Sequence, residues 1–167
     1  MPTPDFILRL RERIGHEPLW LVGTTAVVVD ASTGPAHGGG RLLLVRRADS
    51  GDWSPVAGIV EPGEHSADAA EREVLEEASV VAEVERLASV SVTAEYEYPN
   101  GDRTQYTNLT YRLRYVGGEA AVGDDESTEV AWFPLDGLPP MREDYLQRIR
   151  TALEDRPDTV LLRGREP

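Results

Sequence analysis

The chain has 167 residues, of which 40% are hydrophobic and 28% charged, and this balance predicts a single globular domain over residues 1–167. Its 17 basic residues, all Arg, stand against 30 acidic residues, and the net charge of −13 disfavours duplex nucleic acid as a partner. The lack of cysteine and lysine excludes disulfides, thiolate metal ligands, cysteine nucleophiles and Schiff-base chemistry. No apolar run is long enough to span a membrane and the N-terminus lacks a signal-peptide pattern, so a cytoplasmic protein without a membrane partner is expected.

Hydrophobic spacing and residue composition predict three helices and five strands. The helices are expected over residues 4–14 (within an N-terminal helical segment, 1–16), 66–78 and 141–154 (the C-terminal helix), and Ser66 is the expected N-cap of the second. The strands are expected over residues 18–29, 41–47, 80–97 (with a break near Arg86), 104–116 and 129–133. A loop is expected over residues 31–40 and a turn over residues 49–52. A hairpin turn is expected over residues 99–102, which contain Asn100-Gly101. This order predicts the α/β (α+β) class, as an α/β/α sandwich on a mixed, partly open sheet.

The most informative feature is a row of carboxylates in the helix expected over 66–78. Glu73, Glu76 and Glu77 are spaced i, i+3 and i+4, so they share one helix face. Like charges at this spacing destabilise a helix by a few tenths of a kcal/mol, and the C-terminal half of a helix disfavours anions. A divalent cation would remove both penalties, and carboxylate oxygens suit Mg²⁺ or Mn²⁺. The pattern alone leaves open a metal site and a solvated acidic face.

Residues before and within this helix favour the metal site. Gly58 and Gly63 allow the backbone to approach a ligand closely, and Glu64 lies just ahead of the helix, where it is expected to face the same cluster. Arg72 lies four residues before Glu76 and is expected to pair with it and orient it.

The stretch from Gly58 to Val80 resembles the signature of the Nudix hydrolase family (MutT-like), G-x5-E-x7-R-E-U-x-E-E-x-G-U, where U is a bulky apolar residue. Eight of its nine fixed positions match, and Ser79, in place of the Gly, is expected to adopt a left-handed conformation at a cost of about 1 kcal/mol. The resemblance implies a Nudix-type fold and Mg²⁺- or Mn²⁺-dependent hydrolysis of a nucleoside diphosphate linked to a moiety X by metal-activated water. It implies that the metal ligands are Glu64, Glu73, Glu76, Glu77 and the Ala57 carbonyl, and that these carboxylates and Arg72 are catalytic.

The family pattern allows two positions for the general base. In some members it lies within the signature, and in others it lies on a later loop. Glu126 and Glu129, near the start of the last expected strand, are the candidates for the later position, and ordinary surface charge is the alternative for both.

Residues outside the signature bear on the substrate. Members that hydrolyse ADP-ribose often carry a Pro at the position where this chain has Tyr96, and the coenzyme A and NADH submotifs of the family are absent. Tyr96 and Tyr98 share a strand face, so one of them could stack on a nucleobase. Arg46 and Arg47 end a strand, and alternation predicts that one of the two points toward the cleft, where it could bind phosphate. A nucleoside or dinucleoside polyphosphate is therefore preferred as the substrate.

Two other functions remain open. One is an ADP-ribose or sugar-nucleotide pyrophosphatase, and the other is a non-catalytic Nudix ligand-binding module, which is disfavoured because the signature carboxylates are retained. An isopentenyl diphosphate isomerase is disfavoured because that chemistry uses a Cys in the family. The expected partners are a small nucleotide-type substrate and, as one assembly that the sequence allows, a second copy of the chain in a homodimer.

Overall fold

The computed structural model describes residues 3–32, 39–98 and 100–163. Parts of the expected loop (33–38) and of the expected hairpin turn (Pro99) lie outside the described residues. In chain order, the helices and strands are α1 (Asp5–Ile14), β1 (Leu19–Asp30), β2 (Arg41–Arg47), β3 (Trp53–Ser54), β4 (Val56–Ile59), α2 (Ser66–Ala78), β5 (Val80–Val92), β6 (Tyr96–Glu97), β7 (Arg103–Gly118), β8 (Ser127–Pro134), α3 (Glu143–Leu153) and β9 (Val160–Leu161).

One mixed sheet organises the molecule, as the sequence predicts. Its strands run in the order β3-β2-β1-β7-β5-β9, with β4 paired to β1, β6 to β7 and β8 to β2. β1 and β7 are parallel, whereas β7 pairs with β5 in the antiparallel sense. Short β4 pairs with the middle of β1, from Gly23↔Ile59 to Ala26↔Val56, so β2 joins β1 only at its end. The region around β4 is therefore where the sheet meets the loop that leads into α2.

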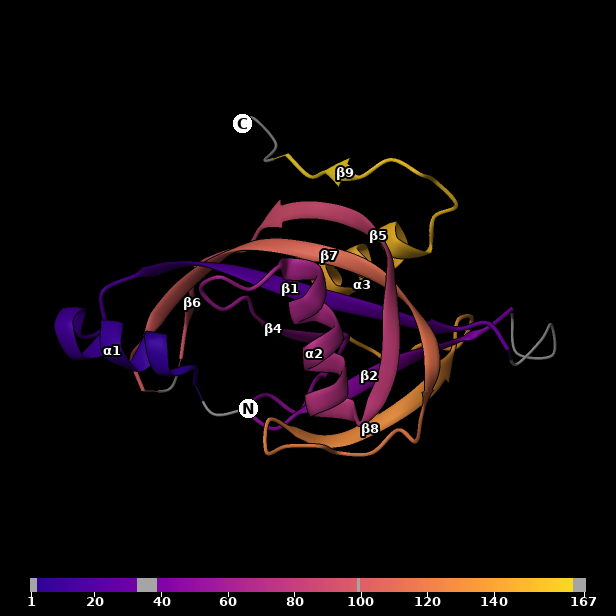
Figure 1. Cartoon of the computed structure of the whole chain (residues 1–167), viewed down its shortest axis with the longest axis horizontal. Helices are drawn as coiled ribbons and strands as arrows, with labels where there is room; N and C mark the ends of the chain where they lie inside the picture. The colour runs from indigo at the N-terminus through magenta and orange to yellow at the C-terminus, as the bar shows by residue number, and fades with distance from the viewer. Residues whose placement is uncertain (1–2, 33–38, 99, 164–167) are drawn as a thin grey trace.

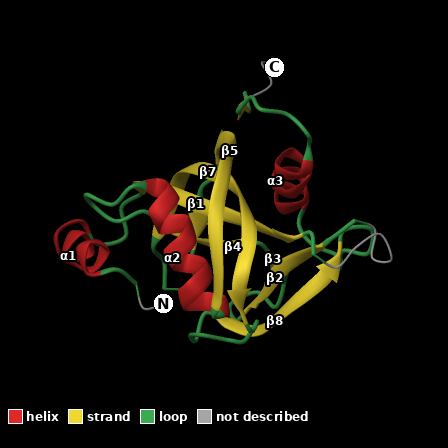
Figure 2. Cartoon of the chain, turned by 45° about the vertical axis from the view of Figure 1, so that its right-hand side comes forward, coloured by secondary structure: helices red, strands yellow, loops and turns green. Residues whose placement is uncertain are grey.

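The two faces of the sheet carry separate apolar cores, and a helix covers each face (Figures 1 and 2). Ala26 and Val28 of β1 pack in the core that includes Val74 of α2. Val27 and Val29 pack in the core that includes Ile149 of α3. Since successive side chains of a strand point to opposite faces, the run Ala26–Val29 must be apolar throughout to serve both cores. The predicted sandwich is confirmed, with α2 and α3 as its outer layers.

The prediction of one long strand over residues 80–97 is wrong, because the structure has two strands there. β5 ends at Val92, and β6 is a separate strand that also pairs with β7. Thr93 lies between them: its side-chain Oγ1 accepts the backbone N–H of Tyr106 at 3.0 Å, and its carbonyl accepts the side chain of Gln105 at 3.0 Å. These side-chain hydrogen bonds replace part of the regular ladder. The expected break near Arg86 is present as a shift of register between Val84 and Arg86.

Some local expectations are also wrong. The sequence predicted no strands for β3, β4 and β9, which are two to four residues long and depend on long-range pairing. Ser66 is not the cap of α2, because His65 holds the N-cap position and the Ser66 hydroxyl lies 2.7 Å from the Tyr111 hydroxyl instead. Ser79 does adopt the expected left-handed conformation, with φ 56° and ψ 25°, and its N–H bonds to the Leu75 carbonyl at 3.1 Å.

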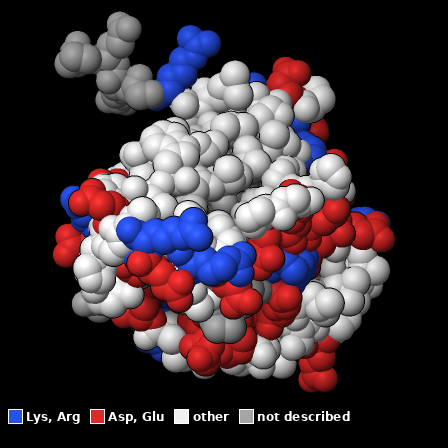
Figure 3. Space-filling view, turned by 60° about the vertical axis from the view of Figure 1, so that its left-hand side comes forward, with Lys and Arg blue, Asp and Glu red and all other residues white. Residues whose placement is uncertain are grey.

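The surface of the molecule mixes charges of both signs. On the face shown in Figure 3, Arg side chains lie in a row among numerous Asp and Glu side chains. Acidic side chains elsewhere in the molecule also pair with Arg, as Glu85 does with Arg112 at 2.8 Å. Within the described ranges, no helix has both the length and the apolar character needed to cross a membrane.

Candidate functional site

Arg72 holds together the acidic groups of the signature. From the middle of α2, its Nε donates to Glu64 at 2.7 Å, and its Nη1 donates to both Glu73 and Glu76 at 2.9 Å. Its Nη2 also donates to the Ile59 carbonyl at 3.3 Å, which ties the helix to β4. The guanidinium lowers the pKa of the Glu64 carboxyl through its hydrogen bond. The expected pairing of Arg72 with Glu76 and the expected approach of Glu64 to the cluster are both present.

Glu73 is buried against a glycine of β4. Only 3% of the Glu73 surface is exposed. A Cβ placed on Gly58 would lie 2.0 Å from both Cδ and Oε1 of Glu73, far inside van der Waals contact. A glycine is therefore required at position 58 for space, because any side chain would occupy the volume of the Glu73 carboxylate. Ala57, the next residue on β4, pairs with Thr25 of β1.

The pKa of Glu77 is raised further above its ordinary value than that of Glu73. Glu77 is 4% exposed, and burial together with the neighbouring Glu73 and Glu126 raises its pKa to about 9. Burial likewise raises the pKa of Glu73 to about 7, although Arg72 opposes this shift. In the described part of the chain, no hydrogen bond or ion pair reaches the Glu77 carboxylate. Without a cation, this site thus disfavours the ionised forms of its two buried carboxylates.

A loop before β8 brings two acidic residues to the cluster: Glu126, which the sequence offered as a candidate base, and Asp124, which it did not single out. Gly123 packs directly on the end of α2, with its N–H bonded to the Glu77 carbonyl at 3.0 Å. A Cβ on Gly123 would lie 1.9 Å from the Glu76 carbonyl oxygen. This close packing brings Asp124 and Glu126 near enough to Glu77 to raise its pKa. The acidic run at 124–126 is visible in the sequence, but its approach to α2 depends on tertiary packing.

The donor set fits a divalent metal, although the side chains are not arranged as a finished metal site. Among residues 3–32, 39–98 and 100–163, no group of three His, Asp or Glu side chains is placed to hold an ion. Arg72 instead occupies carboxylate oxygens of Glu64, Glu73 and Glu76. Among the described residues, no ion pair neutralises the Glu77 carboxylate. The cluster also offers hard oxygen donors, which Mg²⁺ and Mn²⁺ prefer as ligands. Arg72 bonds Oε1 of Glu73 and Oε2 of Glu76, and the second oxygen of each carboxylate could serve as a metal ligand while Arg72 stays bound.

A large cavity of about 1260 Å³ opens beside this cluster. Its lining includes six of the residues predicted to form the site: Ala57, Glu73, Arg47, Tyr96, Tyr98 and Glu126. Arg46 and Glu129 lie outside the cavity, where they pair with each other at 3.7 Å. As predicted, one of the two Arg lines the cavity, and it is Arg47; the register of β2 against β8 shifts between Arg46 and Arg47, so regular alternation alone does not account for this.

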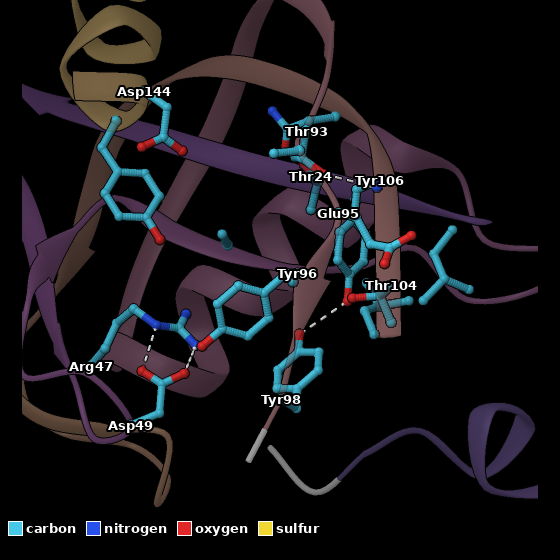
Figure 4. Close-up of a pocket in the computed structure, with 18 of the residues that line it drawn as sticks. Thr24, Arg47, Asp49, Thr93, Glu95, Tyr96, Tyr98, Thr104, Tyr106 and Asp144 are labelled. Carbon is cyan, nitrogen blue, oxygen red and sulfur yellow. Dashed lines mark hydrogen bonds and ion pairs between the residues drawn. The ribbon is translucent and has the colours of Figure 1, made fainter. Parts of the chain in front are cut away.

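Aromatic and charged groups line the same part of the cavity, where Tyr96 and Tyr98 lie beside Arg47 and Asp49 (Figure 4). The rings of Tyr96 and Tyr98 meet edge to face with centroids 4.7 Å apart, and the Tyr98 hydroxyl lies 3.2 Å from that of Tyr106. Burial raises the pKa of Tyr98, so its hydroxyl remains protonated. Arg47 forms a two-pronged ion pair with Asp49, through bonds of 2.9 and 2.6 Å. The two Tyr rings offer faces for stacking, and Arg47 beside them offers a guanidinium that is paired with Asp49.

The start of α3 supplies lining residues that the sequence analysis missed. Arg142, Asp144, Tyr145 and Arg148 all border the cavity. The amphipathic pattern correctly predicts a helix here, but Arg148 belongs by type to its polar face. Arg148 is buried because α3 packs over the cavity, and the periodicity of the sequence does not indicate where a cavity lies.

The chain matches a family model described as NUDIX domain over residues 22–154. Among curated proteins, it is 34% identical over 105 residues to "NAD-capped RNA hydrolase NudC" of Pseudomonas syringae pv. tomato, and 36% identical over 108 residues to that of Pseudomonas aeruginosa. Each match covers 62% of this chain and 35% of the relative, so the chain spans about a third of the length of these relatives.

Solved structures share the fold. An ADP-ribose pyrophosphatase from Streptococcus suis superposes with a TM-score of 0.62 at 21% identity, covering 84% of this chain and 98% of that one. The NUDIX domain of Shewanella oneidensis NrtR, complexed with ADP ribose, gives a TM-score of 0.57 at 17% identity over 90% of this chain and 97% of the other. At these identities the likeness establishes the architecture alone.

Proposed function

The chain belongs to the Nudix hydrolase family, and on that basis we propose that it hydrolyses the phosphoric anhydride bond of a nucleoside diphosphate linked to a second moiety X. The observation that carries the proposal is the buried Glu73 carboxylate, seated on Gly58 at the wall of the cavity and followed one turn later by buried Glu77. Retention of this costly arrangement supports a catalytic role over a purely ligand-binding one.

We propose that Mg²⁺ or Mn²⁺ is the cofactor, held by Glu73, Glu76 and Glu77 with help from Glu64 and the Ala57 carbonyl. When bound, the ion would neutralise charge on the phosphates and lower the pKa of a water molecule. Arg72 orients the carboxylates in its absence. Glu126 borders the cavity and is held near Arg47 by the hydrogen bond from the Ala48 N–H to its carbonyl at 2.8 Å. This position favours Glu126 over Glu129 as the group that takes the proton of the attacking water.

The cavity favours a substrate with two bulky ends. At about 1260 Å³ it exceeds the roughly 300–1000 Å³ typical of small-molecule sites. Tyr96 is 38% exposed and offers a ring for stacking, while Arg47 offers a cation for a phosphate. These features support a dinucleotide-type substrate in which X is itself a nucleoside or a group of similar size.

A substrate panel tests this proposal. We expect release of a nucleoside monophosphate from diadenosine tetraphosphate, a nucleoside triphosphate, NADH or ADP-ribose in the presence of Mg²⁺, with kcat/KM highest for a substrate that carries two nucleosides. Tyr96→Ala should raise KM about tenfold for base-bearing substrates, because stacking on an aromatic ring contributes about 1–3 kcal/mol per base. A tenfold preference for ADP-ribose would instead support the pyrophosphatase alternative. No turnover on the whole panel would contradict the proposed activity.

A second prediction concerns pH and metal together. In the unfolded chain Glu77 ionises near its ordinary pKa of 4.5, whereas in the fold its pKa is about 9. Between these values the folded state binds more protons than the unfolded state, so without metal the stability should fall as pH rises. Metal binding requires the ionised carboxylates, so Mg²⁺ should raise the Tm more at about pH 8.5 than at about pH 6.

Thermal unfolding in EDTA and in Mg²⁺ at the two pH values measures both effects. The Tm in EDTA should drop between the lower and the higher pH, and saturating Mg²⁺ should reverse the drop. Equal Mg²⁺-induced shifts at both pH values would contradict the assignment of the buried carboxylates as ligands.

A further inference from the structure

Arg148 is a buried cation that the protein neutralises poorly. It lies on α3, borders the cavity and is 8% exposed. Its Nη1 donates to the Thr25 hydroxyl at 3.3 Å and its Nη2 to Asp144 at 3.5 Å. Among the described residues these are its two hydrogen bonds, and both are long, although a guanidinium carries five N–H donors. A buried charge with so few partners is costly unless a further anion reaches it.

The neighbours of Arg148 do not supply that anion. Asp144 also accepts two hydrogen bonds from Arg142, at 3.0 and 3.2 Å, so a single carboxylate serves two guanidiniums. Both guanidiniums lie over the ring of Tyr145, at 5.1 and 5.5 Å from its centroid. Burial lowers the pKa of Arg148, as expected for a cation without a full counter-charge. Asp52 adds a second negative charge near Arg142, so the shortfall of counter-charge is at Arg148, whose acidic partner among the described residues is Asp144 at 3.5 Å.

This cationic group and the signature carboxylates line the same cavity. Glu73 and Glu126 border it from α2 and the loop before β8, and Arg148 borders it from α3, on the other face of the sheet. In Figure 4, Asp144 marks the α3 side, apart from the Arg47–Asp49 pair. The cavity thus has an acidic region suited to a metal-bound pyrophosphate and a separate region suited to a bare anion.

We propose that Arg148 binds a phosphate monoester on the nucleoside part of the substrate, distinct from the pyrophosphate that is cleaved. The inference rests on the proposed function and specifies its substrate class: nucleotides with an additional phosphate on a ribose hydroxyl. A guanidinium binds two oxygens of a phosphate through parallel N–H bonds. A ribose hydroxyl has one oxygen and no negative charge, so it cannot take the place of that phosphate. Tyr145, whose ring lies 5.5 Å from the Arg148 guanidinium, lines the cavity beside it.

Binding without metal tests the subsite independently of hydrolysis. Isothermal titration of the full chain in EDTA should show that adenosine 2′,5′-bisphosphate or its 3′,5′ isomer binds at least about tenfold more tightly than AMP. The isomer that binds more tightly identifies the hydroxyl. Arg148→Gln should abolish this advantage and leave AMP binding unchanged, and Arg148→Lys should retain part of it. Arg150→Gln is the matched control, because Arg150 lies on the same helix with its side chain 61% exposed and paired to Glu143.

Three results would overturn the proposal: equal affinity of the wild type for AMP and both bisphosphates, an unchanged advantage in Arg148→Gln, or the same loss for AMP and the bisphosphates in that variant. If Arg148→Gln does not fold, Arg148→Lys decides, since an unchanged advantage there would show that the guanidinium fork plays no part. A failure of the proposed hydrolysis would appear separately, as absence of turnover with Mg²⁺ while the binding difference persists.

Discussion

Replacing Glu77 by Gln is expected to lower kcat by about three orders of magnitude while leaving the fold intact. A metal ion at a phosphoryl-transfer site supplies several kcal/mol of transition-state stabilisation, and each 1.4 kcal/mol corresponds to a tenfold change in rate. The amide mimics the neutral carboxyl that the fold favours, because the pKa of Glu77 is raised to about 9. The Tm in EDTA should therefore equal or exceed that of the wild type, and its decline with rising pH should be weaker.

Glu83→Gln is the control for this experiment. Glu83 lies on β5, is 58% exposed and pairs with Arg114, so its substitution should change neither kcat nor the pH dependence of the Tm. Steady-state rates and thermal unfolding of both variants, with and without Mg²⁺, separate catalysis from folding. If Glu77→Gln retained full turnover and the Mg²⁺-induced Tm shift of the wild type, Glu77 would not be a metal ligand.

The sequence predicts the helix that carries the site because two local rules agree there. Helix formers fill residues 66–78, and the spacing of Glu73, Glu76 and Glu77 places them on one face. The left-handed Ser79 follows from the family pattern at the helix end. These features depend on neighbours within one or two turns, so no knowledge of the tertiary structure is needed.

The rest of the site depends on long-range packing. Glu126 and Glu129 look alike in the sequence, and only the register of β8 against β2, which pairs Glu129 with Arg46, places one of them at the cavity and the other outside it. Arg148 likewise resembles any polar residue of an amphipathic helix until α3 is packed on the sheet. Strand β4, which holds Gly58, is four residues long and forms through its pairing with β1.

Gly58→Ala is expected to reduce kcat/KM by about a hundredfold and to lower stability by about 1–3 kcal/mol, the usual effect of overpacking a tight site. The added methyl group would meet the Glu73 carboxylate at 2.0 Å, so either β4 or the Glu73 side chain must move. Because Arg72 ties Glu73 to Glu76 and Ile59, a displaced Glu73 also disturbs the remaining carboxylates.

Gly117→Ala controls for the general cost of a methyl group at a glycine, since a Cβ there meets no atom within 4 Å and the residue has no left-handed φ. It should leave activity and Tm close to wild type. A double variant, Gly58→Ala with Glu73→Asp, shortens the acidic side chain and should recover part of the lost stability, because the clash is with the Glu73 carboxylate itself. If Gly58→Ala lowered activity with no loss of stability and the double variant recovered nothing, the close packing of Glu73 on β4 would not be what positions the carboxylates of α2.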